Sequence, residues 1–145
     1  MNFQLLAAIA AIGGLATALQ AHFMGLIDKR MGTLESVFIT YFSGGALIGL
    51  LMLIQRGGNL TANAGVPWYA YSSGALGLVI VGSLAYSVPR LGLVAVITIF
   101  VFAQFAMGAL IDHFGWMGSA VRPLTISRLV GMAVVLAGIW LIIRE

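Results

Sequence analysis

Charged residues are scarce in this chain, and cysteine is missing. Of the 145 residues, only 8% are charged and 61% are hydrophobic, whereas about 25% of the residues in a soluble domain are charged. The mean hydropathy is +1.09. The composition therefore excludes an ordinary soluble domain and predicts an integral membrane protein.

The missing cysteine excludes a disulfide framework, a thiolate nucleophile and a cysteine-ligated metal site. With two histidines, no HExxH motif and no nucleophile elbow, the chain does not read as an enzyme. We expect neither a cofactor nor a metal. The net charge of +3 fits loop residues facing lipid headgroups better than a nucleic-acid surface, so the bilayer is an expected partner and nucleic acid is not.

A further absence concerns the middle of the long apolar segments, where the sequence has no Asp, Glu, Lys or Arg. A central carboxylate is the usual device for coupling a proton to a cationic substrate. The pattern therefore argues against a proton/multidrug antiporter.

Five apolar segments reach the length of about 20 residues that a membrane span needs. The expected spans cover residues 3–27, 34–54, 68–88, 91–111 and 124–143. Pro67 and Pro123 precede the third and fifth spans, as suits a first helical turn, and Pro89-Arg90 predicts a very short connection between the third and fourth. The longest loop is expected to run through Val66. All loops are too short for a second domain, so we predict one all-α transmembrane domain over residues 1–145.

The apolar start of the chain has no basic segment before it and exceeds the core of a signal peptide, which predicts a retained first helix. Five spans place the two termini on opposite sides of the membrane. The loop cations are divided almost evenly, with Lys29, Arg30, Arg90 and Arg144 on one side and Arg56, Arg122 and Arg128 on the other. Because cationic loops favour the cytoplasm, four against three leaves two alternatives: an N-terminus outside, or insertion in both orientations.

Residues 101–115 contain the most informative polar pattern. Gln104, Gly108 and Asp112 are spaced four residues apart and therefore share one helix face. An amide in the apolar interior needs a hydrogen-bond partner, because lipid offers none. The face should border protein or a water-filled cavity, with Phe100 one turn away as an aromatic wall. We interpret it as the centre of a substrate site.

Gln20 and Tyr41 are the candidates that would complete this site from the first two spans. Gln20 serves equally well as a hydrogen bond between helices or as a cavity residue. Asp112 ends the fourth span, where it opposes the helix dipole and needs a cation. A structural ion pair with Arg122 or Arg128 is favoured over a role in substrate binding or gating.

Small residues recur at helix-packing spacing, and Gly131 and Gly138 in the fifth span are one example. Close backbone approach holds membrane helices together, because no hydrophobic force acts between them in lipid. These two glycines are therefore the predicted contact of a dimer.

Motifs spread along nearly the whole chain resemble one known family. They are Trp68-Tyr69, Pro89-Arg90-Leu91-Gly92, Gln104, Ile111-Asp112-His113-Phe114-Gly115, Arg122-Pro123-Leu124 and Ala137-Gly138. The chain resembles the YdcZ-like family of short bacterial inner-membrane proteins in the drug/metabolite transporter superfamily, and the Gln-x7-Asp-His-Phe-Gly block is the most specific part. The family pattern has an asparagine four residues after the first-span glutamine, whereas this chain has Met24. The glycine spacing of the fifth span is similar to the dimerising helix of small multidrug-resistance proteins.

The resemblance implies an exporter of small molecules in the bacterial inner membrane. Transporters with inverted repeats hold the substrate between two halves of opposite orientation. A single five-span chain, which is one such half, reaches this arrangement only by pairing with an oppositely inserted copy or a paralogous five-helix partner. We therefore predict alternating access across an antiparallel dimer. The alternative is a membrane scaffold or regulatory subunit that transports nothing.

Overall fold

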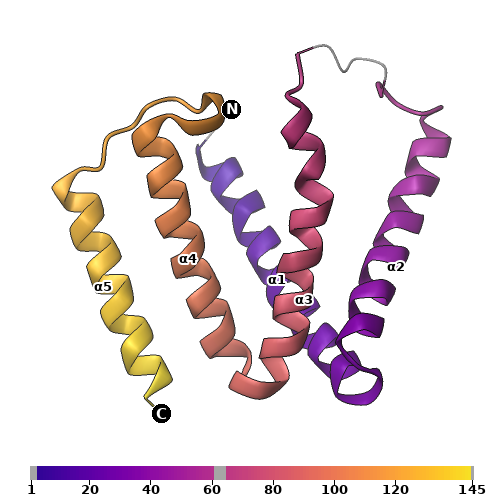
Figure 1. The fold of residues 1–145 in the computed structure, drawn as a ribbon, viewed down its shortest axis with the longest axis horizontal. Coiled ribbons are helices and arrows are strands. Elements are labelled where there is room, and N and C mark those ends of the chain that lie inside the picture. The colour runs from indigo at the N-terminus through magenta and orange to yellow at the C-terminus, as the bar shows by residue number, and fades with distance from the viewer. Residues whose placement is uncertain (1–2, 61–64, 145) are drawn as a thin grey trace. The chain divides into compact units, whose positions relative to one another are not determined.

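The computed structural model describes residues 3–60 and 65–144, and all regular structure in this part of the chain is helical (Figure 1). Its five long helices are apolar enough to cross a membrane, which confirms the prediction of five helical spans. The helices are α1 (Phe3–Met31), α2 (Thr33–Ile54), α3 (Ser73–Leu91), α4 (Leu93–Phe114) and α5 (Ile126–Ile143). Two short 3-10 helices, η1 (Trp68–Ser72) and η2 (Trp116–Gly118), precede α3 and follow α4. Part of the longest predicted loop, 61–64, lies outside the described residues.

The chain forms two compact units, Met1–Arg90 with α1 to α3 and Leu91–Glu145 with α4 and α5. The prediction of a single domain over the whole chain stays a prediction. Within the first unit, α1 and α2 meet at a turn of one residue, Gly32, whose φ is 113°. Only glycine adopts this conformation without strain. The Ser36 hydroxyl then donates a buried hydrogen bond of 2.9 Å to the Met24 carbonyl, which ties α2 to α1.

Helix α1 extends four residues beyond the predicted end at residue 27, through Lys29 and Arg30 to Met31. The predicted span stops before these charged residues, but basic side chains stabilise the last turn of a helix through its dipole. The structure corrects the third connection in the same way. Pro89 and Arg90 lie in the last turn of α3, and Gly92, with a φ of 85°, makes the connection alone. The φ that proline fixes is itself helical, so α3 continues through Pro89 and ends at Leu91, directly before Gly92.

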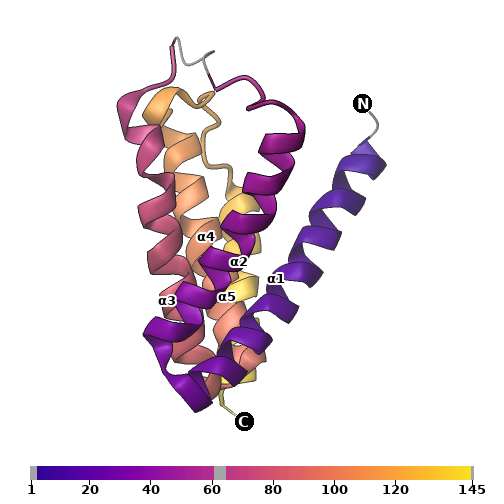
Figure 2. The ribbon, with the colours of Figure 1, turned by 90° about the vertical axis from the view of Figure 1, so that its right-hand side faces the viewer.

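Helices α1 and α3 approach most closely where Gly25 faces Val88. A Cβ atom added to Gly25 would lie 3.0 Å from Cγ1 of Val88, and both residues are buried. By contrast, Gly13 on the same helix has no atom within 4 Å of such a Cβ. Figure 2 shows the N-terminal half of α1 leaning away from α2, so the packing of this unit is concentrated at the end of α1 near the turn.

An ion pair fastens the same end of the first unit. Nη1 of Arg90 lies 3.1 Å from Oδ2 of Asp28, whose side chain is only 5% exposed. The Thr33 hydroxyl donates a second hydrogen bond, of 2.5 Å, to Oδ1 of Asp28. The Arg90 guanidinium also stacks over the Tyr86 ring, 3.6 Å from its centroid. Each charge therefore has partners that replace water.

The second unit is a pair of antiparallel helices whose connecting loop is tied back to the end of α4 (Figure 1). Gly115, with a φ of 63°, ends α4 in the left-handed conformation typical of helix C-caps. Three hydrogen bonds return to α4: Ser119 Oγ to the Ile111 carbonyl (3.1 Å), Arg122 N to the Asp112 carbonyl (2.8 Å) and Leu124 N to His113 Nδ1 (3.2 Å). The first two satisfy carbonyl groups in the last turn of α4, and the third ties the loop to a side chain of the same turn.

Helix α5 begins two residues later than the predicted span, at Ile126. Thr125 is its N-cap, and its hydroxyl oxygen accepts a bond of 3.4 Å from the Arg128 amide. A threonine directly before an apolar run is a recognisable start signal, so the sequence contained this boundary.

We predict that Gly25→Ala destabilises the protein while Gly13→Ala does not. Both changes give α1 the same gain in helix propensity, but only the first forces a methyl group against Val88. Overpacking of this kind costs about 1–3 kcal/mol. Thermal unfolding of the two purified variants in the same detergent measures the difference, and equal unfolding temperatures would contradict the close approach of α1 and α3.

Candidate functional site

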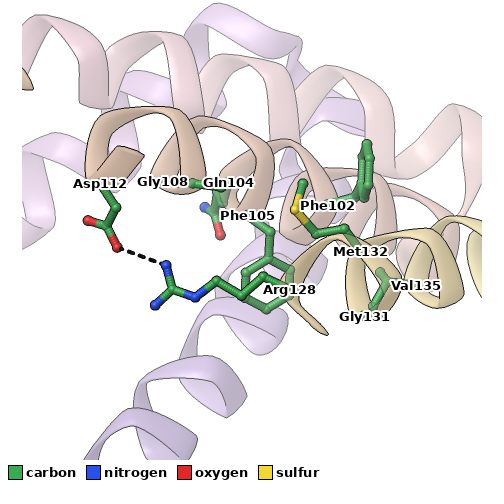
Figure 3. A pocket seen from close by; sticks show the side chains of 10 residues that line it. Phe102, Gln104, Phe105, Gly108, Asp112, Arg128, Gly131, Met132 and Val135 are labelled. Carbon is green, nitrogen blue, oxygen red and sulfur yellow. Dashed lines mark ion pairs between the residues drawn. The ribbon is translucent and has the colours of Figure 1, made fainter. Parts of the chain in front are cut away.

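A pocket of about 510 Å³ lies between α4 and α5 in the second unit (Figure 3). This volume is within the range of small-molecule sites. The lining residues are Phe102, Gln104, Phe105, Gly108, Ala109 and Asp112 from α4, and Arg128, Gly131, Met132 and Val135 from α5. Most of the lining is apolar, with one amide and one pair of opposite charges.

Two glycines make the room for this pocket, one on each helix. Gly108 and Gly131 have no atom within 4 Å of the position that a Cβ would occupy. They therefore differ from Gly25, which lies against a neighbouring helix. Both glycines are also exposed in the single chain, as are Gln104 and Phe105, so the pocket is an open groove along the helix pair.

The amide of Gln104 is the polar group of the groove that lies nearest the middle of α4. Gln104 follows the first residue of α4 by eleven positions and precedes the last by ten, which places it at mid-helix. Its side chain makes no hydrogen bond to any residue that the structure describes. In lipid an unsatisfied amide costs several kcal/mol. The amide therefore needs water, a ligand or another protein.

Asp112 and Arg128 form an ion pair about two helical turns from Gln104, at the end of α4 and the start of α5. Nη1 of Arg128 lies 3.8 Å from Oδ2 of Asp112, and the two side chains are 45% and 38% exposed. Figure 3 shows the guanidinium reaching across the groove toward the carboxylate. Of the two arginines that the sequence proposed, Arg128 provides the charge. Arg122 contributes its backbone N–H, which donates to the Asp112 carbonyl.

The aromatic wall of the pocket differs from the predicted one. Phe102 and Phe105 line it, and Phe100 is not among the lining residues. At about 100° per residue, Phe100 lies roughly 140° around the helix from Phe105, beyond the edge of the lining face marked by Gln104. Spacing by four residues placed Gln104, Gly108 and Asp112 on the lining face, whereas its extension to Phe100 passes beyond the edge of that face.

Gln20 and Tyr41 belong to the first unit. Tyr41 lines a groove of about 410 Å³ whose other lining residues are all apolar: Leu34, Val37, Phe38, Phe42 and Leu78. The Tyr41 hydroxyl lies against Gly77 and occupies the space that a Cβ would need. Gln20 is exposed on α1 and makes no hydrogen bond to a described residue. Their part in the substrate site stays a prediction.

The two glycines of the predicted dimer contact share one face of α5. Gly131 borders the pocket, whereas Gly138 does not, and neither has an atom within 4 Å of an added Cβ. A dimer contact at Gly131 would therefore also border the groove. The contact itself stays a prediction.

Sequence reasoning named Arg128 and Gly131 of α5 but missed the two other lining residues of this helix, Met132 and Val135. Met132 and Val135 follow Arg128 at spacings of four and seven, which is the signature of a common helix face. That pattern was available, but nothing local indicates which face of α5 turns toward α4. Within residues 3–60 and 65–144, no three His, Asp or Glu side chains gather closely enough to hold a metal ion.

Comparison with known proteins identifies a family. The family model described as "Putative inner membrane exporter, YdcZ" matches residues 5–141, nearly the full chain. This confirms the resemblance seen in the sequence motifs. No curated protein and no solved structure matches the chain.

We predict an energetic coupling of about 0.2–1 kcal/mol between Asp112 and Arg128, the range of partly exposed ion pairs. A double-mutant cycle with Asp112→Asn and Arg128→Gln, measured by thermal unfolding, should show it. The matched cycle with Arg122→Gln should be additive, because only the backbone of Arg122 contacts Asp112. Additivity in both cycles would refute the pair.

Proposed function

This chain belongs to the YdcZ family of inner membrane exporters, and we propose that it exports a small molecule that binds in the groove between α4 and α5. An exporter family is not a class of enzymes, and five membrane-length helices make the protein a multi-pass membrane protein. The family name implies the bacterial inner membrane as its location.

The observation that carries the proposal is the amide of Gln104, which makes no hydrogen bond to residues 3–60 or 65–144. A glutamine at the middle of a membrane helix is costly unless something polar reaches it. The groove beside it has the volume and the apolar lining of a ligand site. A substrate passing through this groove supplies a hydrogen bond that none of the described residues makes to the amide.

The groove needs a second wall, which an inverted copy of the chain or a paralogue would provide. Gln104, Phe105, Gly108 and Gly131 are exposed in the single chain, and lipid cannot satisfy the amide. The nearly equal loop charges permit insertion in both orientations. In an antiparallel pair the two grooves open toward opposite sides of the membrane, which is the geometry that alternating access uses.

Gln104→Leu should strongly reduce export and leave folding intact. Leucine is compatible with both the apolar groove and lipid, but it removes the hydrogen bond to the substrate. That loss is worth about 1–3 kcal/mol, or a factor of roughly 5 to 150 in affinity. The measurement is a metabolite profile of the medium around cells that express the wild type or the variant.

Met107→Leu is the matched control for this experiment. Met107 is exposed on the same helix but does not line the groove, so a compound exported by the wild type should also appear with this variant. A Gln104→Leu protein that exports the same compound at the wild-type rate would end the proposal.

In the antiparallel arrangement, copies of the chain insert in both orientations. Each loop should therefore be accessible from one side of the membrane in some copies and from the other side in the rest. Because the chain has no cysteine, Met31→Cys and Ala120→Cys each introduce a single thiol at opposite ends of the spans. Both residues are exposed. An impermeant maleimide should label each variant in intact cells and also in inside-out vesicles. Labelling of each position from one face alone would exclude dual insertion.

A further inference from the structure

Asp112 and Arg128 each lie at the helix end that disfavours their charge. Asp112 is in the last turn of α4, at the negative end of the helix dipole, and Arg128 is in the first turn of α5, at the positive end. An ion pair placed only for stability would be better with the two charges exchanged. The observed placement instead adds each charge to the helix pole of the same sign. The groove therefore presents a strong negative pole beside a strong positive one.

The contact between these two charges is loose. Their separation of 3.8 Å exceeds the 2.7–2.9 Å, approximately, of a charged hydrogen bond. Neither side chain makes a hydrogen bond to another described residue. The guanidinium donors and the carboxylate oxygens remain available to a ligand. The Asp28–Arg90 pair, by contrast, is shorter and its carboxylate is nearly buried.

The negative charge of Asp112 beside the positive charge of Arg128 determines which charges a ligand of this groove should carry. A cation bound at Asp112 would lie beside the repelling Arg128, and an anion bound at Arg128 would lie beside the repelling Asp112. Either one would leave a net charge in a groove whose other lining is mostly apolar, where charges are poorly screened. A ligand with an ammonium and a carboxylate group gives each protein charge a partner and keeps the total at zero.

The rest of the groove indicates the size and polarity of the uncharged part of the ligand. One turn from Asp112 and Arg128, Gly108 and Gly131 leave open space. A turn further, the lining is apolar, with the amide of Gln104 at its edge (Figure 3). Two turns correspond to roughly 11 Å, which accommodates the length of a branched or aromatic side chain.

We propose that the groove binds a small zwitterion with an apolar side chain, such as an apolar α-amino acid. Asp112 binds its ammonium group, Arg128 binds its carboxylate, and the apolar wall beyond Gly108 and Gly131 holds its side chain. This assignment rests on the proposed function, since it names the class of substrate for the same site.

The test compares matched ligands on the purified full-length protein in detergent. L-leucine is measured against 3-methylbutylamine, which lacks the carboxylate, and 4-methylpentanoate, which lacks the ammonium. L-phenylalanine is measured against 2-phenylethylamine and 3-phenylpropanoate. We expect at least one zwitterion to raise the unfolding temperature, with half-saturation at a concentration at least tenfold lower than for its two analogues. An analogue that binds as well, or no effect of either zwitterion, overturns the inference.

Two single variants should each remove the preference for L-leucine over a different one of its two analogues. Asp112→Asn should remove the advantage of L-leucine over 4-methylpentanoate, and Arg128→Gln should remove its advantage over 3-methylbutylamine. A merely structural pair would not separate the two analogues. Arg122→Gln, which removes a charge from the same loop outside the groove, should leave the preference unchanged. Equal effects of the two single variants on both analogues overturn the inference.

The double exchange Asp112→Arg with Arg128→Asp tests whether the charges are placed for stability. It keeps an ion pair and puts each charge at the helix end that favours it, so the variant should unfold at a higher temperature than the wild type. A lower unfolding temperature, or failure to fold, would show that the natural arrangement serves the fold and would overturn the inference.

Failure of this inference is distinguishable from failure of the proposed function. Export that depends on Gln104 but carries a plain cation or anion overturns the zwitterion and leaves an exporter with this groove. Absence of any export that depends on Gln104 overturns the exporter groove and the zwitterion together.

Discussion

The absence of hydrogen-bonding partners in lipid is the constraint on which this structure depends. The hydroxyl groups along the spans largely meet it within their own helix, by donating to a carbonyl one turn back. Such bonds are made by Thr17, Thr40, Ser43, Ser83 and Thr98. A glutamine cannot satisfy its whole amide in this way. Gln20 and Gln104 therefore stand out as the groups that require something beyond the described chain.

The same constraint drives charges to the helix ends, where the two ion pairs serve different purposes. Asp28 is nearly buried and receives bonds from Arg90 and Thr33, so it fastens α1 to α3. Asp112 is more exposed and its pair with Arg128 is longer. Burial without partners would be costly, which explains why the buried carboxylate has two partners and the exposed one can remain available to a ligand.

Glycines inside the helices have two opposite roles, and only their surroundings distinguish the two. At Gly25 the missing side chain lets two helices touch, whereas at Gly108 and Gly131 it leaves open space. In sequence these positions look alike, because each is a glycine inside an apolar helix. The space becomes useful in the second unit because an amide and two opposite charges border it.

By itself, the sequence determined the membrane class, the five spans and the shared face of Gln104, Gly108 and Asp112, because hydropathy and helical periodicity are local properties. It also contained the cap at Thr125, although the predicted boundary missed it. The tertiary structure decided which arginine pairs with Asp112, that Phe102 and Phe105 replace Phe100 as the aromatic wall, and that Met132 and Val135 complete the groove. These features depend on how α5 is rotated against α4. That rotation is set by the loop bonds and by packing between residues distant in the chain, which no local pattern encodes.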